Sequence, residues 1–456
     1  MAEEKARVSS KPIKKKKNMP ATKIIALAFL GIILVGTLLL MLPVASRDGR
    51  SCGFISAFFT ATSATCVTGL TVVETGVQWS GFGQIVILTM IEIGGLGFMS
   101  AASLVLFLLK RKVGLRHRMV MAQALSVDDM ESIVRLQKWV LLGSLLVQVT
   151  GALVLSFRLL TRYDWVAALA FGVFHSVSAF CNAGFDILGL GNSVNLFNND
   201  PVILLTLSAL VVIGGLGFFV WEEVVTVRRF RKFSVYTKLV LITSGVLILG
   251  GAVLFALLEW NNPGTLGGMP VGQKLLNSLF QSVTLRTAGF ASVNQGALTE
   301  GGKATSIVIM LIGGSSGSTA GGIKTVTFVV MLLFIWSRMR GKNAVTAFRR
   351  NIPTAKITDA MTITTLVAGL AVLGAVFISA VDKMSFTDSL YETVSALATV
   401  GLTTGITSQV SVLSQLLLIV FMYFGRVGIL TISLGFLMGD KAQDRIRYAD
   451  TNLLIG

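Results

Sequence analysis

The sequence predicts an all-α membrane protein in which four repeats, each made of a span, a pore helix and a second span, surround one pore. Composition, the apolar segments and an internal repeat predict it. The chain has 456 residues, 53% hydrophobic and only 13% charged, with a mean hydropathy of +0.78. A soluble domain carries about 25% charged residues, so a water-soluble fold is excluded. The net charge of +17 on such an apolar chain indicates basic cytoplasmic loops rather than nucleic-acid binding.

Eight apolar stretches are long enough to cross a bilayer, which takes roughly 20 helical residues. They are residues 24–42, 82–109, 139–157, 201–221, 239–258, 304–336, 360–381 and 410–438. Four shorter apolar segments lie between them, at 54–68, 166–183, 275–285 and 390–400. Such segments are more often re-entrant or interfacial than spanning. Taken singly they favour interfacial helices, but the repeat described below favours re-entrant ones.

The basic residues predict the topology. Of the 39 Lys and Arg, 29 fall in the tail before residue 24, in 110–138, 228–238 and 338–356, and after residue 438. By the positive-inside rule these segments are cytoplasmic. We therefore expect a multi-pass protein of the bacterial cell membrane with both termini in the cytoplasm, into which the four short segments enter from outside.

An internal repeat has two markers. Each short segment ends in two small or polar residues, a Gly and a bulky apolar residue, and these glycines are 115, 105 and 112 residues apart. The second marker, Gly-Gly-Leu-Gly-Phe at 94–98, recurs at 214–218, with equivalents that begin at Gly313 and Gly425. The predicted parts are a basic tail (1–23), four repeats (24–118, 119–238, 239–356 and 357–440) and a C-terminal tail (441–456).

The ends of the short segments are predicted to form an ion filter. A helix that stops in mid-membrane leaves its last carbonyls unpaired, with about half a negative charge. Four such ends around an axis stabilise a dehydrated cation, as carbonyl rings do in potassium channels, and Gly permits the backbone to turn there. Gly in all four favours K⁺, although the glycines as mere helix C-caps remain an alternative. The predicted filter residues are Val67, Thr68, Gly69, Asn182, Ala183, Gly184, Thr287, Ala288, Gly289, Thr399, Val400 and Gly401.

A loop in the third repeat is predicted to form a gate. Residues 313–324 contain five Gly and four Ser or Thr, which disfavours a helix; the alternative is a Gly-rich helix-packing face. Arg426 takes the place of a Gly in the other repeats, so we expect it to bond loop carbonyls and hold the loop closed, unless it snorkels to the cytoplasm. The gate residues are Gly313, Gly314, Ser315, Ser316, Gly317, Ser318, Thr319, Ala320, Gly321, Gly322, Lys324 and Arg426.

Other charged residues lie near these segments. Arg286 ends the third pore helix and is expected to brace the filter. Asp186 and Glu74 are candidates for concentrating cations at the outer mouth, while the role of Glu92 stays open. The chain has only two His and three Cys and no cluster of carboxylates near a membrane face, so the sequence does not predict an enzyme.

Two motifs, Arg-Thr-Ala-Gly-Phe at 286–290 and Gly-Ser-Thr-Ala-Gly-Gly-Ile-Lys at 317–324, together with the filter glycines, resemble the Trk/Ktr/HKT superfamily of potassium transporters. The chain is most similar to the KtrB type of membrane subunit, because only a basic tail precedes the first repeat. In that family the third-repeat loop and the fourth-repeat Arg form the intramembrane gate, which corresponds here to residues 313–322 and Arg426.

The resemblance implies K⁺ uptake by a homodimer with one pore per protomer. It also implies a cytosolic RCK partner, a KtrA-like octameric ring, which alone binds a nucleotide (ATP/ADP or NAD). This chain is expected to hold no cofactor, to carry K⁺ at the filter carbonyls, to contact membrane lipid and not to bind nucleic acid; Na⁺ dependence stays open. A Na⁺-conducting member of the superfamily and an unrelated secondary carrier are the alternative functions.

Overall fold

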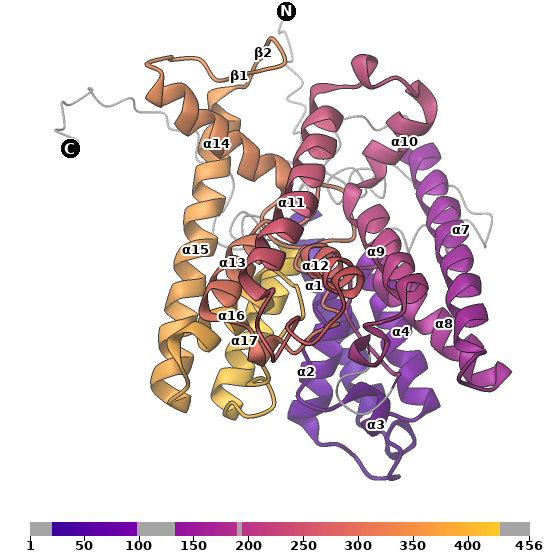
Figure 1. The fold of residues 1–456 in the computed structure, drawn as a ribbon. Coiled ribbons are helices and arrows are strands. Elements are labelled where there is room, and N and C mark those ends of the chain that lie inside the picture. The colour runs from indigo at the N-terminus through magenta and orange to yellow at the C-terminus, as the bar shows by residue number, and fades with distance from the viewer. Residues whose placement is uncertain (1–20, 98–132, 189–193, 429–456) are drawn as a thin grey trace, which may run out of the picture.

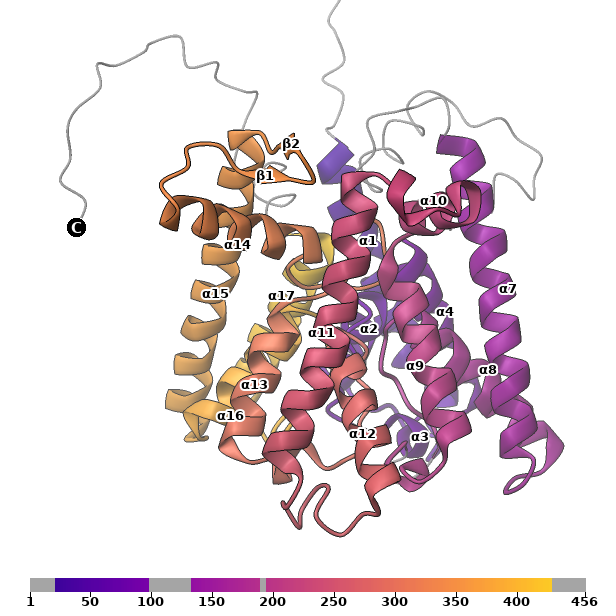
Figure 2. The same cartoon turned by 45° about the horizontal axis from the view of Figure 1, so that its top comes forward.

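The computed structural model describes residues 21–97, 133–188 and 194–428. Four long helices run alongside one another through the molecule (Figures 1 and 2). They are α1 (Ala21–Leu40), α7 (Ile133–Leu159), α11 (Val235–Glu259) and α15 (Thr354–Asp382). Within the described ranges these four are long and apolar enough to cross a membrane, and a bent pair adds a fifth candidate. They coincide with the first predicted span of each repeat.

A short helix follows each long helix and packs against it. These helices are α2 (Phe54–Thr65), α8 (Trp165–Phe180), α12 (Val271–Thr284) and α16 (Phe386–Leu397). In three of them a hydroxyl two residues after an aromatic side chain donates to a carbonyl of the long helix. These bonds are Ser176 to Gln148 (2.6 Å), Ser282 to Ile248 (2.7 Å) and Thr393 to Ala371 (3.0 Å). The core surrounds the C-terminal ends of these helices, because residues 59–68, 280–288 and 391–400 are all buried.

The third helix of each group is shorter than the predicted second span. These helices are α4 (Gly81–Leu96), α9 (Pro201–Leu216), α13 (Glu300–Leu311) and α17 (Val412–Val427). Three of them end at a Gly with positive φ: Gly97 (83°), Gly217 (93°) and Gly428 (92°). Residues 98–109 and 429–438 of the predicted spans lie outside the described residues, as do the tails at 1–20 and 441–456.

The predicted span 201–221 is not one continuous helix. At Gly217 the chain bends by 94° into α10 (Phe218–Val227), because the left-handed Gly interrupts the helix within 201–221. Within the predicted span 304–336 the chain is irregular at 312–324, where the Gly and Ser content predicted a loop, and it then continues as α14 (Thr325–Met339). Figure 2 shows α14 lying across the end of the bundle rather than along it.

The same end of the molecule carries α10 and a small hairpin that the all-helical prediction missed (Figure 1). Its strands β1 (Thr346–Ala347) and β2 (Arg350–Asn351) pair antiparallel, with Thr346 opposite Asn351. The remaining short elements are α3 (Thr75–Gln78), η1 (Pro43–Ala45), η2 (Val194–Phe197), η3 (Phe230–Lys232) and η4 (Gln295–Ala297).

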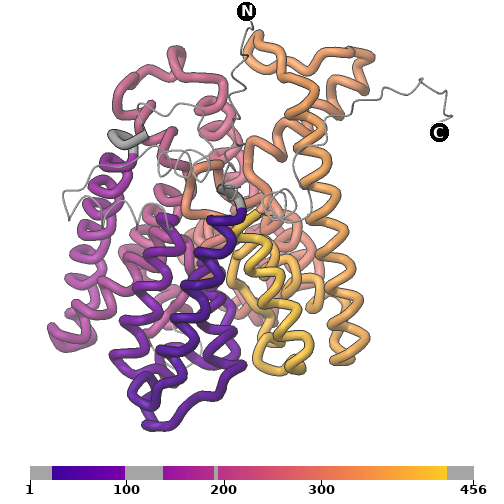
Figure 3. Tube along the Cα trace, turned by 180° about the vertical axis from the view of Figure 1, so that it is seen from behind, coloured from indigo at the N-terminus to yellow at the C-terminus, as the bar shows by residue number. Residues whose placement is uncertain are grey.

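The first and last groups of helices lie side by side, as the view from behind shows (Figure 3). Helix α17 contacts both α1 and α2. The Tyr423 hydroxyl on α17 donates to the Ala26 carbonyl on α1 (2.8 Å). The described chain therefore closes on itself, with its first and last groups in contact.

Candidate functional site

The C-terminal ends of the four short helices converge on one point. Each is followed by a triplet that ends in Gly, at residues 67–69, 182–184, 287–289 and 399–401. A Cβ built on each Gly would overlap the carbonyl oxygen of the middle residue in the next triplet: Gly69 that of Ala183, Gly184 that of Ala288, Gly289 that of Val400 and Gly401 that of Thr68. Because the fourth triplet touches the first, the four form a closed ring, here called the glycine ring.

The backbone of every triplet is left-handed at its first and third residues. The first residues have φ of 57° (Val67), 59° (Asn182), 67° (Thr287) and 51° (Thr399), and the four glycines lie between 65° and 94°. The left-handed residue that follows each short helix is thus the first residue of its triplet. The Gly two positions later is needed because a Cβ there would overlap the next triplet. A β-branched residue at positive φ is uncommon, and three of the four first residues are Val or Thr. Such strain is found where a fold holds a functional conformation.

One position in each short helix holds its triplet. The N–H of the middle residue donates to the carbonyl of an upstream Ser or Thr: Thr68 to Ser63, Ala183 to Ser178 and Val400 to Ser395 (all 2.8 Å), and Ala288 to Thr284 (2.9 Å). The hydroxyl of the same Ser or Thr bonds the Gly or the residue after it. Ser63 and Ser395 accept from Gly69 (3.0 Å) and Gly401 (3.1 Å), while Ser178 and Thr284 donate to Phe185 (2.8 Å) and Phe290 (2.7 Å).

Three hydroxyls of the triplets have no hydrogen-bond partner although they are buried: those of Thr68, Thr287 and Thr399. Thr287 and Thr399 occupy the same place in their triplets. A buried hydroxyl without a partner loses free energy unless something else binds it.

The segment 312–324 packs against the ring. Its two ends pair with each other, since the N–H of Gly313 donates to Ile323 (2.9 Å). Its middle docks on the second Gly-Gly marker, where the N–H of Ser315 donates to Gly215 (3.0 Å). The Thr319 hydroxyl donates to the carbonyl of Phe180, the last residue of α8 (3.0 Å), and a Cβ on Gly321 would overlap the side chain of Thr399. The loop therefore contacts the helix end before the second triplet and the first residue of the fourth.

Arg426 joins this loop to α4. Its guanidinium donates to the Thr319 carbonyl in the loop (2.5 Å) and to the carbonyls of Gly94 and Gly95 (2.9 Å for Gly95). The contact with the loop agrees with the expectation from sequence, and the two bonds to α4 are additional. The Lys324 ammonium, by contrast, donates to Ala320 within the loop itself (2.7 Å). The role of both residues in gating stays a prediction.

Two further charged residues, Arg286 and Asp186, make local contacts. Arg286 donates to the Ser244 hydroxyl on α11 (3.1 Å) and is almost fully buried. Asp186 accepts hydrogen bonds from the backbone of Leu188 (2.9 Å) and Val194 (3.1 Å) and pairs with His175 (2.9 Å).

Glu92 on α4 accepts from Gln148 on α7 (2.9 Å) and from the Cys181 thiol just before the second triplet (3.3 Å). It thereby links the first two groups of helices beside the ring. Glu74 is exposed. In the part of the chain that the structure describes, no group of three or more His, Cys, Asp or Glu side chains could hold a metal ion.

Comparisons with known proteins agree with one another. A family model described as TrkH, cation transport protein, matches residues 5–445. The chain is 39% identical over 436 residues to the Ktr system potassium uptake protein B of Bacillus subtilis, covering 95% of this chain and 96% of the relative. It is 36% identical over 446 residues to the potassium/sodium uptake protein NtpJ of Enterococcus hirae, covering 97% and 98%. The fold is similar to the crystal structure of the potassium transporter TrkH from Vibrio parahaemolyticus, with a TM-score of 0.72 at 18% identity, covering 94% of this chain and 86% of that one.

Proposed function

Because this chain belongs to the TrkH family of cation transport proteins, we propose that it is the pore-forming membrane subunit of a K⁺ uptake system. It is a multi-pass membrane transporter and not an enzyme. The observation that supports a pore is the closed glycine ring, in which four helix ends meet with the same left-handed backbone.

The proposed fold is four repeats around one ion pathway that passes through the glycine ring. Each short helix directs its C-terminal end at the ring, so four partial negative charges favour a cation there. Left-handed residues at alternate positions turn successive carbonyls toward one side, where they replace the hydration shell of the ion. The unpaired hydroxyls of Thr287 and Thr399 add two ligands at the first position of their triplets. Arg286, anchored to Ser244, braces the third triplet.

The proposed gate is the loop at 312–324 with Arg426. The loop contacts Phe180 at the end of α8 and Thr399, which follows α16. Arg426 ties it to α4 and so favours the blocked state. Lys324, bonded to Ala320, is proposed to stabilise the shape of the loop itself.

The proposed orientation places both termini, α10, α14 and the hairpin in the cytoplasm. Figure 2 shows α10 and α14 at the same end of the molecule. Exposed basic residues on or beside these two helices support the orientation: Arg228, Arg231, Lys232, Arg338, Arg340 and Lys342. The proposed assembly is a homodimer gated by a cytosolic RCK ring that binds the nucleotide. The relatives named as protein B of a Ktr system support a partner subunit.

A second candidate is permeation of Na⁺ as well as K⁺. It is favoured by the similarity to a protein named for uptake of both ions. Relatives that conduct Na⁺ tend to carry Ser in place of the first filter Gly, and this chain has Gly69. We therefore expect K⁺ preference in the natural protein, and we expect a Gly69→Ser variant to lose it; retained selectivity would mean that the filter is misassigned.

Growth of a K⁺-uptake-deficient bacterium at low K⁺ tests the proposed function. Expression of this chain, alone and with a co-expressed RCK subunit, is expected to restore growth, and more strongly with the partner. The amount of protein in the membrane is measured in both strains. Absence of rescue by well-expressed protein in either condition would overturn the K⁺-uptake function.

A further inference from the structure

One position in each short helix carries a polar side chain directly after the buried aromatic residue. Phe59, Phe174, Phe280 and Tyr391 are followed by Thr60, His175, Gln281 and Glu392. All four of these polar residues are buried, and Gln281 and Glu392 are completely inaccessible. Buried polar groups are costly unless they are paired, so the partners of these side chains indicate what the position does.

Three of these side chains reach the segment that follows the glycine ring. His175 Nε2 lies 2.9 Å from Asp186 Oδ1. Gln281 and Gln295 exchange two hydrogen bonds of 2.7 and 3.1 Å. The Glu392 carboxylate accepts from the hydroxyls of Thr403 and Thr407, the latter at 3.0 Å to both oxygens. Asp186 and Thr403 are each the second residue after the ring Gly, so the contact recurs at the same place in the second and fourth repeats. In the first repeat the Thr60 hydroxyl has no partner.

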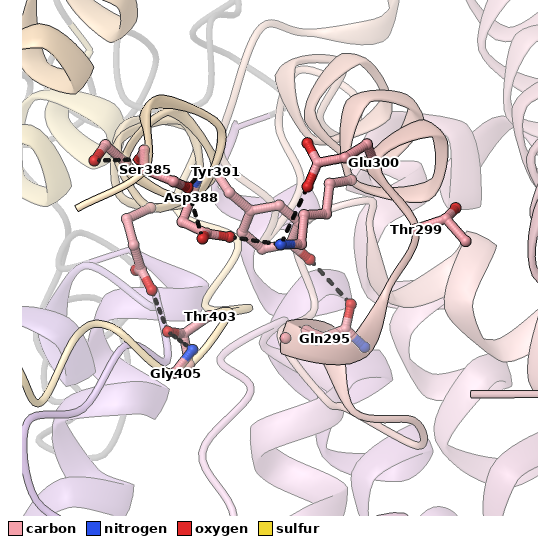
Figure 4. Close-up of polar contacts among 12 residues, drawn as sticks. Gln295, Thr299, Glu300, Ser385, Asp388, Tyr391, Thr403 and Gly405 are labelled. Carbon is pink, nitrogen blue, oxygen red and sulfur yellow. Dashed lines mark hydrogen bonds and ion pairs between the residues drawn. The ribbon is translucent and has the colours of Figure 1, made fainter. Parts of the chain in front are cut away.

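We call each contact between one of these polar side chains and the segment after the ring a brace. Figure 4 shows that the braces of the third and fourth repeats are connected. Tyr391 points at Gln295 and its hydroxyl donates to the Gln295 side-chain oxygen (3.0 Å). Thr403, which holds Glu392, also accepts from the N–H of Gly405 (2.9 Å). Glu392 therefore ties the segment after Gly401 to α16. Tyr391, its neighbour on α16, ties that helix to Gln295 of the third repeat.

Glu392 differs from the other braces because it is a carboxylate. It accepts hydrogen bonds from two hydroxyls of the segment after the ring, those of Thr403 and Thr407, and none of the described ion pairs involves it. Removing the Glu392 side chain therefore leaves two hydroxyls of the segment after the ring without their acceptor.

We infer that this position braces the filter from behind, and that Glu392 is a positioning residue that sets the preference of the pore for K⁺ over Na⁺. The inference rests on the proposed function. A carbonyl ring distinguishes two cations by the number and spacing of its oxygens, and packed backbone shifts when its support is removed. Without Glu392 the fourth triplet can move away from the first and third. The ring then discriminates less well against the smaller ion, Na⁺.

The test is cation competition in proteoliposomes that contain the full-length protein. Uptake of ⁸⁶Rb⁺ is measured while external K⁺ or Na⁺ is varied, and the ratio of the two half-inhibiting concentrations is the readout. This ratio does not depend on how much protein is folded. We expect Glu392→Ala to lower the K⁺ preference about tenfold, equivalent to about 1.4 kcal/mol. Glu392→Gln keeps an acceptor oxygen and an amide that can bond the hydroxyls, so it should stay within about twofold of the natural protein.

Glu259 supplies a matched control. It is also a completely buried carboxylate, and it accepts from Thr265 (2.8 Å) and Thr299 (2.6 Å), but it lies at the end of α11 outside the four bracing positions. Glu259→Ala is expected to change the amount of protein but not the ion ratio. A Glu392→Ala ratio equal to that of the natural protein, or an equal loss in Glu259→Ala, would overturn the inference.

A second variant covers the case in which Glu392→Ala does not fold. The double change Thr403→Val and Thr407→Val removes the two donors while keeping side-chain shape, and we expect it to lower the ratio in the same direction. An unchanged ratio in this variant also overturns the inference. If instead the natural protein shows no K⁺-competed uptake, the proposed function itself has failed, which is a distinguishable result.

Discussion

Replacing Arg426 by Ala tests the proposed gate directly. The guanidinium donates to three carbonyls, but only that of Thr319 belongs to the loop, while Gly94 and Gly95 belong to α4. Opening the loop therefore breaks one hydrogen bond to a charged donor, worth about 1.5–3 kcal/mol. Since each 1.4 kcal/mol is about tenfold in an equilibrium constant, the variant should raise the open fraction roughly 10- to 150-fold.

The assay is ⁸⁶Rb⁺ flux into proteoliposomes without the regulatory partner, normalised to folded protein by size-exclusion chromatography. Arg426→Lys should give an intermediate flux, because one ammonium replaces a planar group with five donors. Arg338→Ala is the control: its guanidinium is exposed and bonds Asn343, outside both the loop and the ring, so its loss should leave the flux unchanged. Flux in Arg426→Ala equal to that of the natural protein, at normal expression, would refute the reasoning.

Two further predictions concern the ring and its outer support. Gly401→Ala should abolish selective uptake in the same competition assay, because the φ of 92° is unfavourable for Ala and the new Cβ overlaps the Thr68 carbonyl. Gly405 is the control, since its φ is 103° but a Cβ there meets nothing within 4 Å. Gly405→Ala introduces the same backbone strain without the overlap and should keep selectivity. Asp388 pairs with Lys303 at 2.9 Å. Burial of Asp388 raises its pKa, but the hydrogen bond and charge of Lys303 outweigh this and leave the pKa below its ordinary value. The pair should therefore stabilise the fold by about 0.5–1 kcal/mol above the ordinary carboxyl pKa of about 4 and lose this as the pH falls through the lowered pKa. The advantage in Tm of the natural protein over Asp388→Asn should then be present at neutral pH and vanish in strong acid; an equal difference at both would contradict this assignment.

The sequence predicted the repeated parts of the molecule better than the breaks between them. The long helices follow from continuous apolar runs, and the four Gly turns were recognised because the same pattern recurs four times. The 94° bend at Gly217 was missed because an apolar segment reads as one span whether or not a Gly within it adopts positive φ. The Gly-Gly-Leu-Gly motif at 214–217 contains the residue at which the helix ends. From sequence the motif indicates a repeat, but not that its last Gly ends a helix.

Within the candidate site, the sequence indicated which residues form the triplets and that Arg426 contacts the loop. It did not show that Val67 and its equivalents take the left-handed conformation, because β-branched residues disfavour it and only the packed ring enforces it. It also did not show that Asp186 is already occupied by His175 and backbone N–H groups. The repeated Ser or Thr before each Gly, and the polar residue after each aromatic, were the signals in the alignment that could have predicted these contacts.

The unequal side chains explain why four repeats in one chain suit this site. In the ring the four backbones share one conformation, so the proposed carbonyl ligands are equivalent in the four repeats. Beside the ring, Gly95, Gly215 and Gly314 occupy the place that Arg426 takes in the fourth repeat, and Arg426 reaches carbonyls of the first and third repeats. Four copies of one subunit would put four guanidinium groups there, where like charges at close range strongly repel one another. A fused chain can hold one Arg and one loop beside four equivalent backbones, so the proposed gate can be asymmetric while the proposed carbonyl ring is not.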